Sequence, residues 1–243
     1  MLLIILVPLT ASNVHVSSRE TQPLHGFTWP DHSIPVKIGS VEEISARRAV
    51  LNAMITWNLT QQWFIATYVS GSAAPFNLYE TTSTPTSGII VTFNETQTRD
   101  DWGWTSCRYS YDSQGVFTEI ACRVSLDLSF RSGEALSETQ LQALATHELG
   151  HCLGLDHTTF SETDLMNHSS PNHEVTLPST LNLYAVYLLS KASSLNSLPE
   201  SPVTLPDNIP YQMAVPELAA AQVTAFVTLA LVFALLTRYR RRR

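Results

Sequence analysis

Three histidines and one glutamate lie within eleven residues, HELGHCLGLDH, at spacings that could build a metal site. On a helix, His147 and His151 are one turn apart and leave the same face. Glu148 is offset by one position, so its carboxylate could reach a metal-bound water without ligating the metal. Gly154 could end the helix in a left-handed conformation and return the chain, so that His157 meets the same ion.

Three neutral imidazoles with an open fourth position are typical of a catalytic zinc site. We therefore expect one Zn²⁺ ion bound by His147, His151 and His157. Bound zinc lowers the pKa of water from about 15.7 to about 7. Glu148 would take the proton of that water as it attacks a peptide carbonyl, and pass it to the leaving nitrogen. The alternative is a helix whose histidines are merely solvated or hydrogen-bonded.

The segment resembles the signature of the metzincin zinc endopeptidases, HExxHxxGxxH followed by a methionine-containing turn. Met166, within TDLMNH, is the candidate for that turn. The short gap from His157 to Met166 and the sequence pattern HELGHxLGLxH most resemble those of the matrixin branch. The resemblance implies an α+β, zincin-type catalytic domain with a twisted mixed sheet, two main helices and a C-terminal helix. It also implies a protein or peptide substrate that lies extended beside an edge strand, which we place in residues 115–124.

Two positions depart from the family pattern. Matrixins carry a proline and a tyrosine after the methionine, whereas this chain reads NHSSP, so the depth of the substrate pocket is not predicted. Other metzincins carry a tyrosine two places after the methionine that approaches the zinc. His168 stands there, and we expect a transition-state donor or fifth ligand; the alternative is a surface imidazole. Residues 12–26 also lack a cysteine that could cap the zinc.

Several elements are expected to position the motif. The capping box beginning at Ser137 opens the active-site helix, which runs to Gly154. Helices are also expected at 41–57 and 180–191, and strands at 36–38, 63–69 and 88–93.

Cys107 and Cys122 bracket a hairpin, and a disulfide between them would close a loop of about fifteen residues, worth roughly 3 kcal/mol. Cys152 is expected to be a small buried thiol that points away from the metal. The catalytic domain is expected to cover residues 27–192.

The two ends of the chain differ from the middle. Residues 1–12 form a possible signal peptide, although a wrongly chosen start or a buried N-terminal strand are alternatives. Residues 193–216 are rich in proline and serine and predict a stalk, or else a strap packed on the domain. Residues 217–237 predict a transmembrane helix, because the last twenty carry no charge. The arginine-rich tail, 238–243, then lies in the cytoplasm, which places the catalytic domain outside the cell.

The charge of the chain argues against a nucleic-acid partner. Without the five tail arginines, nine basic and twenty-one acidic residues leave a formal charge of −12. Such a surface cannot neutralise phosphates. We therefore expect a membrane-anchored extracellular zinc endopeptidase. The alternative function is a catalytically silent, zinc-stabilised cell-surface recognition module, although metal binding alone does not need Glu148.

Overall fold

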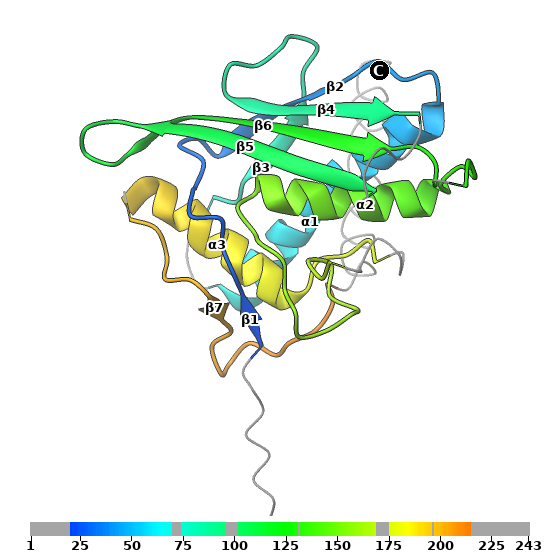
Figure 1. Cartoon of the computed structure of the whole chain (residues 1–243). Helices are drawn as coiled ribbons and strands as arrows, with labels where there is room; N and C mark the ends of the chain where they lie inside the picture. Colours follow the sequence, from blue (N-terminus) through cyan, green and yellow to red (C-terminus); the bar gives the residue numbers. More distant parts are fainter. Residues whose placement is uncertain are drawn as a thin grey trace, which may run out of the picture.

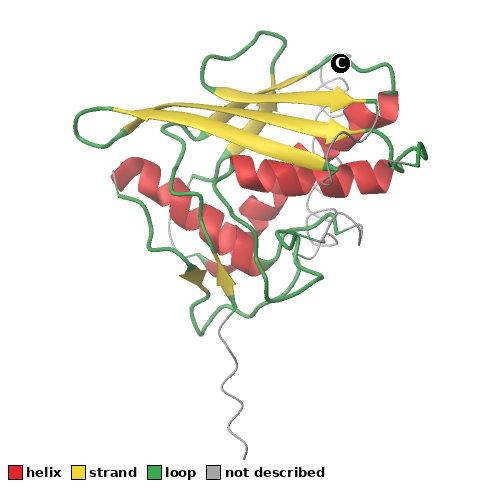
Figure 2. Ribbon diagram, viewed as in Figure 1, coloured by secondary structure: helices red, strands yellow, loops and turns green. Residues whose placement is uncertain are grey.

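The computed structural model describes residues 20–69, 74–95, 102–130, 132–168, 175–195 and 197–214 (Figure 1). One face of a five-stranded sheet is covered by helices, which makes the α+β class correct (Figure 2). Along the chain the elements are β1 (Thr21–Gln22), β2 (Ser33–Ile38), α1 (Ile44–Tyr68), β3 (Asn77–Glu80), β4 (Gly88–Asn94), β5 (Gly103–Tyr111), β6 (Phe117–Asp127), α2 (Glu138–Cys152), α3 (Thr180–Leu195) and β7 (Val203–Thr204).

The main sheet is mixed and has the strand order β3-β2-β4-β6-β5. The first four strands of that order are parallel, and β5 pairs antiparallel with β6. Strand β6 therefore lies inside the sheet, and β5 forms the edge next to α2 (Figure 1). The prediction that residues 115–124 form the edge strand is thus wrong. Most of this segment belongs to β6, which has a neighbouring strand on both sides. Only the full strand order could reveal this.

Helix α1 is longer than the sequence pattern predicts. It continues to Tyr68, so residues 63–69, expected to be a strand, are helical up to that point. Its buried side chains recur at helical spacing through Trp57, Gln61 and Phe64. The Gln61 amide exchanges hydrogen bonds of 3.1 and 3.2 Å with the backbone of Phe76 and so holds the approach to β3. Aromatic and β-branched residues favour strands locally, but this stripe of tertiary contacts overrides the preference.

Helix α2 begins and ends much as its sequence predicts. The Ser137 hydroxyl accepts a hydrogen bond from the Gln140 amide, and the Gln140 side chain accepts one from the Ser137 amide. Two of the orphan N–H groups at the helix start are satisfied in this way. Trp57 of α1 donates its indole hydrogen to the carbonyl of Thr146 at 2.8 Å, deep between the helices. The two long helices are therefore fixed to each other directly beside His147.

Two terminal segments close the fold, and we call residues 20–30 the N-terminal strap and residues 197–214 the C-terminal strap. Strands β1 and β7 pair antiparallel and join the straps (Figure 1). In the C-terminal strap, Val203, Ile209 and Ala214 are buried. Residues 197–214 therefore do not form the expected free stalk; they are the packed strap that was the alternative. The prolines of this segment shape an irregular path along the domain instead of an extended spacer.

The membrane-related predictions concern other parts of the chain. Among the described residues, no helix combines the length and the apolar character that crossing a bilayer requires. The possible signal peptide at 1–12, the transmembrane helix at 217–237 and the tail at 238–243 all lie outside the described residues. They remain predictions from the sequence.

Packing of the C-terminal strap can be tested by deleting part of one buried side chain. Ile209 is 6% exposed, so Ile209→Ala should lower the free energy of unfolding by about 2–4 kcal/mol through lost burial and a residual cavity. Glu200→Ala, at an exposed position of the same strap, is the control and should have little effect. Urea denaturation of the two variants measures the difference. Equal stabilities would mean that the segment is loose in solution.

Candidate metal centre

The three histidines of the motif converge on one point. Their Nε2 atoms form an equilateral triangle, with all three separations at 3.1 Å. His147 and His151 leave adjacent turns of α2 and are buried, while His157 arrives from the loop that follows the helix. Within the described residues, these three side chains form one of the groups able to hold a metal ion. The structure thus brings together all three predicted ligands.

The tight return of the chain after α2 depends on Gly154. Its φ is +99°, a left-handed conformation that other residues adopt at a cost. A side chain there would also lie 3.2 Å from the carbonyl oxygen of Phe27, in the N-terminal strap. The Gly154 carbonyl accepts a hydrogen bond of 2.9 Å from the amide of His25. The turn that delivers His157 is therefore held from outside by the strap.

Hydrogen bonds on the far side of two rings decide where their protons sit. His147 Nδ1 lies 2.6 Å from the carbonyl oxygen of Leu165, and His151 Nδ1 lies 2.8 Å from that of Leu155. A carbonyl can only accept, so each Nδ1 carries the hydrogen and donates it. Each Nε2 of these two rings is then left with a lone pair that points into the triangle. This is the tautomer that a metal ligand requires.

Burial favours the neutral form of the same rings. It lowers the pKa of His147 to about 4, an effect that the hydrogen bond to Leu165 only partly opposes. It also lowers the pKa of His151 well below its ordinary value, with the neighbouring histidines acting in the same direction. Both rings are therefore uncharged at neutral pH and available to a cation.

The triangle fits zinc. A tetrahedral ion at about 2.1 Å from each nitrogen separates its nitrogen ligands by about 3.4 Å, so a widening of about 0.3 Å would admit it. The lone pairs of His147 and His151 face each other at 3.1 Å, so a cation bound between them would be attracted to both. A donor set of three imidazoles suits zinc, and the tautomers of His147 and His151 leave both of their Nε2 atoms free to bind it.

Glu148 lies in the same helical turn and is buried, with 5% of its surface exposed. Its Oε2 accepts a hydrogen bond of 2.6 Å from the hydroxyl of Thr105, which also donates to the Glu148 carbonyl at 3.1 Å. Thr105 lies on β5, so the edge strand itself orients the carboxylate.

Met166 is fully buried, and its neighbours in the turn, residues 164–167, are buried as well. A side chain at Gly150 would meet its sulfur at 2.5 Å, so the turn packs directly on the backbone of α2. The Met166 amide donates to Asp164 Oδ1 at 2.8 Å, and its carbonyl accepts from the amide of Thr158, the residue after His157. The turn is therefore bonded to the residue that directly follows the third histidine.

A buried polar network surrounds Asp164. Its carboxylate accepts hydrogen bonds from Asn182 of α3 and from the Tyr211 hydroxyl, both at 3.1 Å. Asn182 also donates to Gln22 of the N-terminal strap at 2.9 Å, and Gln22 donates to the carbonyl of Asp156 at 2.6 Å. Both straps and α3 are thus connected to the two turns that flank His157.

The remaining predicted residues are placed as follows. His168 is exposed, and its ring centroid lies 5.0 Å from that of His157. It is not part of the group of converging ligand atoms, and its role as a donor stays a prediction.

Cys107 and Cys122 form the expected disulfide, as directly opposed residues of β5 and β6. Cys152 is a free, buried thiol whose pKa is raised by burial.

Two residues beside the centre were not anticipated from the sequence. His25 Nε2 lies 3.3 Å from Nδ1 of His151, and burial lowers the pKa of His25 while Asp156 opposes that shift. Thr105 was missed because its contact depends on which strand forms the edge. Polar alternation along 103–111 could have marked that strand as half-exposed, but nothing in the sequence relates His25 to a helix 126 residues away.

The comparisons with known proteins agree with this geometry. Residues 40–180, more than half of the chain, match the family model described as matrixin. The chain therefore belongs to the matrixin family of zinc metalloproteases. No curated protein matches it.

The depressed pKa of His147 has a consequence for the metal-free protein. Above about pH 6.5 the ring is neutral in both states; below it the unfolded chain takes up a proton that the folded chain refuses until about pH 4. The unfolded state is therefore favoured as the pH falls through this interval, by on the order of 3 kcal/mol from this residue. Urea denaturation in the presence of a chelator, from pH 7 to pH 4, measures the fall. Constant stability over that range would contradict the neutral, buried assignment.

Proposed function

We propose that this chain is a membrane-anchored extracellular zinc endopeptidase. The observation that carries the proposal is the convergence of three imidazole nitrogens at 3.1 Å, with the buried carboxylate of Glu148 in the same helical turn as His147. A site that only binds zinc has no need of that carboxylate. Membership of the matrixin family supports the same reaction class.

The protein residues would divide the chemistry between them. His147, His151 and His157 would hold the zinc through their Nε2 atoms. Bound zinc supplies a Lewis acid that polarises a peptide carbonyl and acidifies water near neutral pH. Leu165 and Leu155 keep two of the rings oriented through their carbonyls, which fixes the open side of the triangle.

Glu148 would act as the general base and then as the general acid. Its carboxylate takes a proton from the attacking water and returns that proton to the leaving nitrogen of the peptide. Thr105 holds Oε2 at 2.6 Å, so the carboxylate does not have to be ordered during the reaction. His168, next to the ring of His157, is our candidate for a further donor to the developing oxyanion.

The substrate would be an extended peptide beside β5. Among the described residues this strand has β6 as its one strand partner, so its other edge can add a further strand. Thr105 lies on β5 and contacts Glu148, which brings a peptide bound there close to the catalytic carboxylate. Pairing through the backbone would supply affinity that does not depend on the side chains of the substrate.

The anchoring part of the proposal is supported by sequence and by the disulfide. Residues 217–237 are long and apolar enough to span a bilayer, and the arginines that follow favour the cytoplasm. The disulfide between Cys107 and Cys122 is typical of an oxidising compartment. The apolar run at 1–12 would direct export.

Replacing Glu148 by Gln separates catalysis from zinc binding. The amide cannot take the proton, so Glu148→Gln should lower kcat on an unfolded protein substrate by about 10²- to 10⁴-fold. Zinc content, measured by mass spectrometry, should stay unchanged because the three imidazoles are intact. Glu134→Gln, at an exposed site before α2, is the matched control and should keep wild-type turnover.

The same measurement tests the alternative function. Wild-type protein that binds zinc but cleaves no better than Glu148→Gln would be a recognition module, not a protease.

The membrane topology can be tested on intact cells that express the full chain. An epitope at the C-terminus should be protected from added protease, whereas the catalytic domain should be digested. Deleting residues 217–237 should release the domain into the medium. A C-terminal epitope digested on intact cells would refute the orientation.

A further inference from the structure

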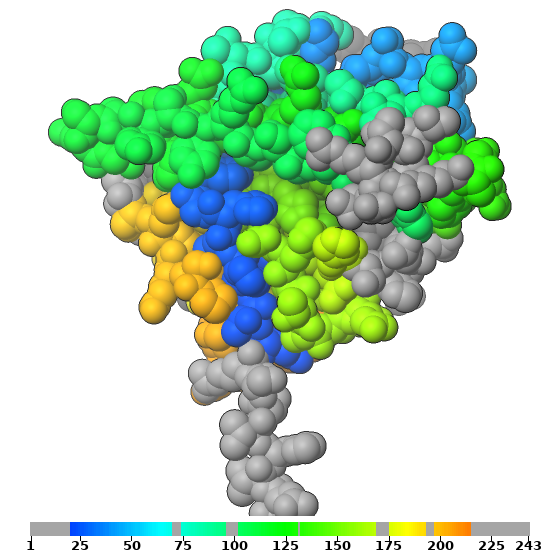
Figure 3. All heavy atoms as spheres, viewed as in Figure 1, coloured from blue at the N-terminus to red at the C-terminus, as the bar shows by residue number. Residues whose placement is uncertain are grey.

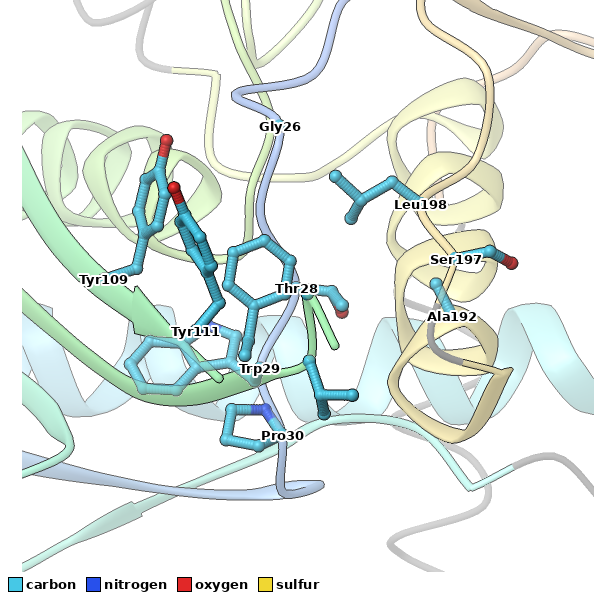
Figure 4. Close-up of a pocket in the computed structure, with 12 residues that line it drawn as sticks. Gly26, Thr28, Trp29, Pro30, Tyr109, Tyr111, Ala192, Ser197 and Leu198 are labelled. Atoms are coloured by element: carbon cyan, nitrogen blue, oxygen red, sulfur yellow. The ribbon is translucent and has the colours of Figure 1, made fainter. Parts of the chain in front are cut away.

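A hollow of about 500 Å³ lies beside the N-terminal strap and shares no lining residue with the histidine triangle. Tyr109 and Tyr111 of β5 form one side, and Ala192 and Leu198 lie across from them (Figure 4). Residues 26–30, including Trp29, pass between the two sides. We call this hollow the strap pocket.

The chemistry of the strap pocket suits an uncharged side chain. Its described lining is aromatic, aliphatic or small, and holds no acidic residue, no basic residue and no histidine. Tyr109, Tyr111 and Leu198 are 45%, 65% and 40% exposed, so much apolar surface there still faces water. A volume of this size is typical of ligand sites. Filling it with an aromatic or large aliphatic group would remove that surface from water.

Strand β5 leads from the catalytic carboxylate to this pocket. Thr105 contacts Glu148, and Tyr109 lies four residues further along, on the same face of the strand. The Tyr109 ring is 5.7 Å from that of Phe27, which joins the end of the strand to the N-terminal strap. At about 3.3 Å per residue, Thr105 and Tyr109 are about 13 Å apart, a length that an extended peptide covers with about four residues.

The position of the N-terminal strap at the surface agrees with a peptide that runs along β5. In Figure 3 the N-terminal strap, in blue, rises beside the yellow-green loop that follows α2 and reaches the green hairpin of β5 and β6. On its other side lie α3 and the C-terminal strap. A peptide that leaves the histidine triangle along β5 therefore meets the strap next.

The pairing geometry gives the direction of that peptide. Antiparallel pairing is slightly the more stable kind, and an antiparallel partner of β5 runs from Tyr109 toward Thr105. Residues near the pocket would then precede the cleaved bond. We propose that the strap pocket binds an aromatic or large aliphatic side chain of the substrate, about four to six residues before the cleaved bond. This inference rests on the proposed function.

Much of this pocket lies outside the residues that match the family model. Residues 26–30, Ala192 and Leu198 all lie outside the matched region, 40–180.

Three peptides with one cleavable core test the inference on the zinc-loaded full chain. One carries Trp five residues before the cleaved bond, one carries Ser there, and one carries Trp five residues after it. We expect kcat/KM to be about tenfold higher for the first peptide than for the other two, through KM, because an aromatic side chain is buried. Tyr111→Ser should reduce this preference to near one. Tyr79→Ser, an exposed tyrosine on the opposite edge strand β3, should preserve it.

Binding to the Glu148→Gln variant, measured by fluorescence anisotropy, keeps this test separate from catalysis. A tenfold preference in binding without any turnover by the wild type would uphold the pocket and refute the protease. Cleavage with no preference, or a preference for Trp after the bond, would overturn the pocket assignment and leave the protease standing. If Tyr111→Ser instead changed the sedimentation of the enzyme and not KM, the pocket would be a contact between two copies, and the assignment would be wrong.

Discussion

Three imidazole nitrogens held face to face are the constraint on which the rest of this domain depends. The Nε2 lone pairs of His147 and His151 repel at 3.1 Å, so the fold must hold these two rings together against that repulsion. It does so from behind: the carbonyls of Leu165 and Leu155 fix two rings, and burial keeps those rings neutral. The contacts of the scaffold thus hold the three rings in a preorganised geometry, as catalytic centres generally require.

The scaffold that holds the triangle extends well beyond the active-site helix. Trp57 anchors α1 to the carbonyl of Thr146, one residue before the first histidine. On the other side, the Asp164 carboxylate accepts hydrogen bonds from the turn of Met166, from α3 and from the C-terminal strap, and so connects them in one buried network. Such a network is favourable only when its members are satisfied. A defect in either strap would therefore be felt at His157, although neither strap contains a ligand.

The sequence predicts what is local and fails where distant segments meet. The spacing of His147 and His151, the cap at Ser137 and the disulfide of the hairpin are set by short-range geometry, and the structure has them. The edge strand, the length of α1 and the packing of residues 197–214 depend on neighbours far along the chain. The role of Thr105 follows from the strand order, and that of His25 from the path of the strap. Neither leaves a local pattern.

The pairing of β1 with β7 has a consequence for biosynthesis. Gln22 and Asn182, which are hydrogen-bonded, are 160 residues apart in sequence. Tyr211 can bond to Asp164 only after the C-terminal strap has left the ribosome. Contacts of such long range are slow to form during folding. The nascent chain would thus expose its histidine motif early but complete the support of His157 last. Newly made protein would therefore lack this support of His157 until residue 211 has been synthesised and packed.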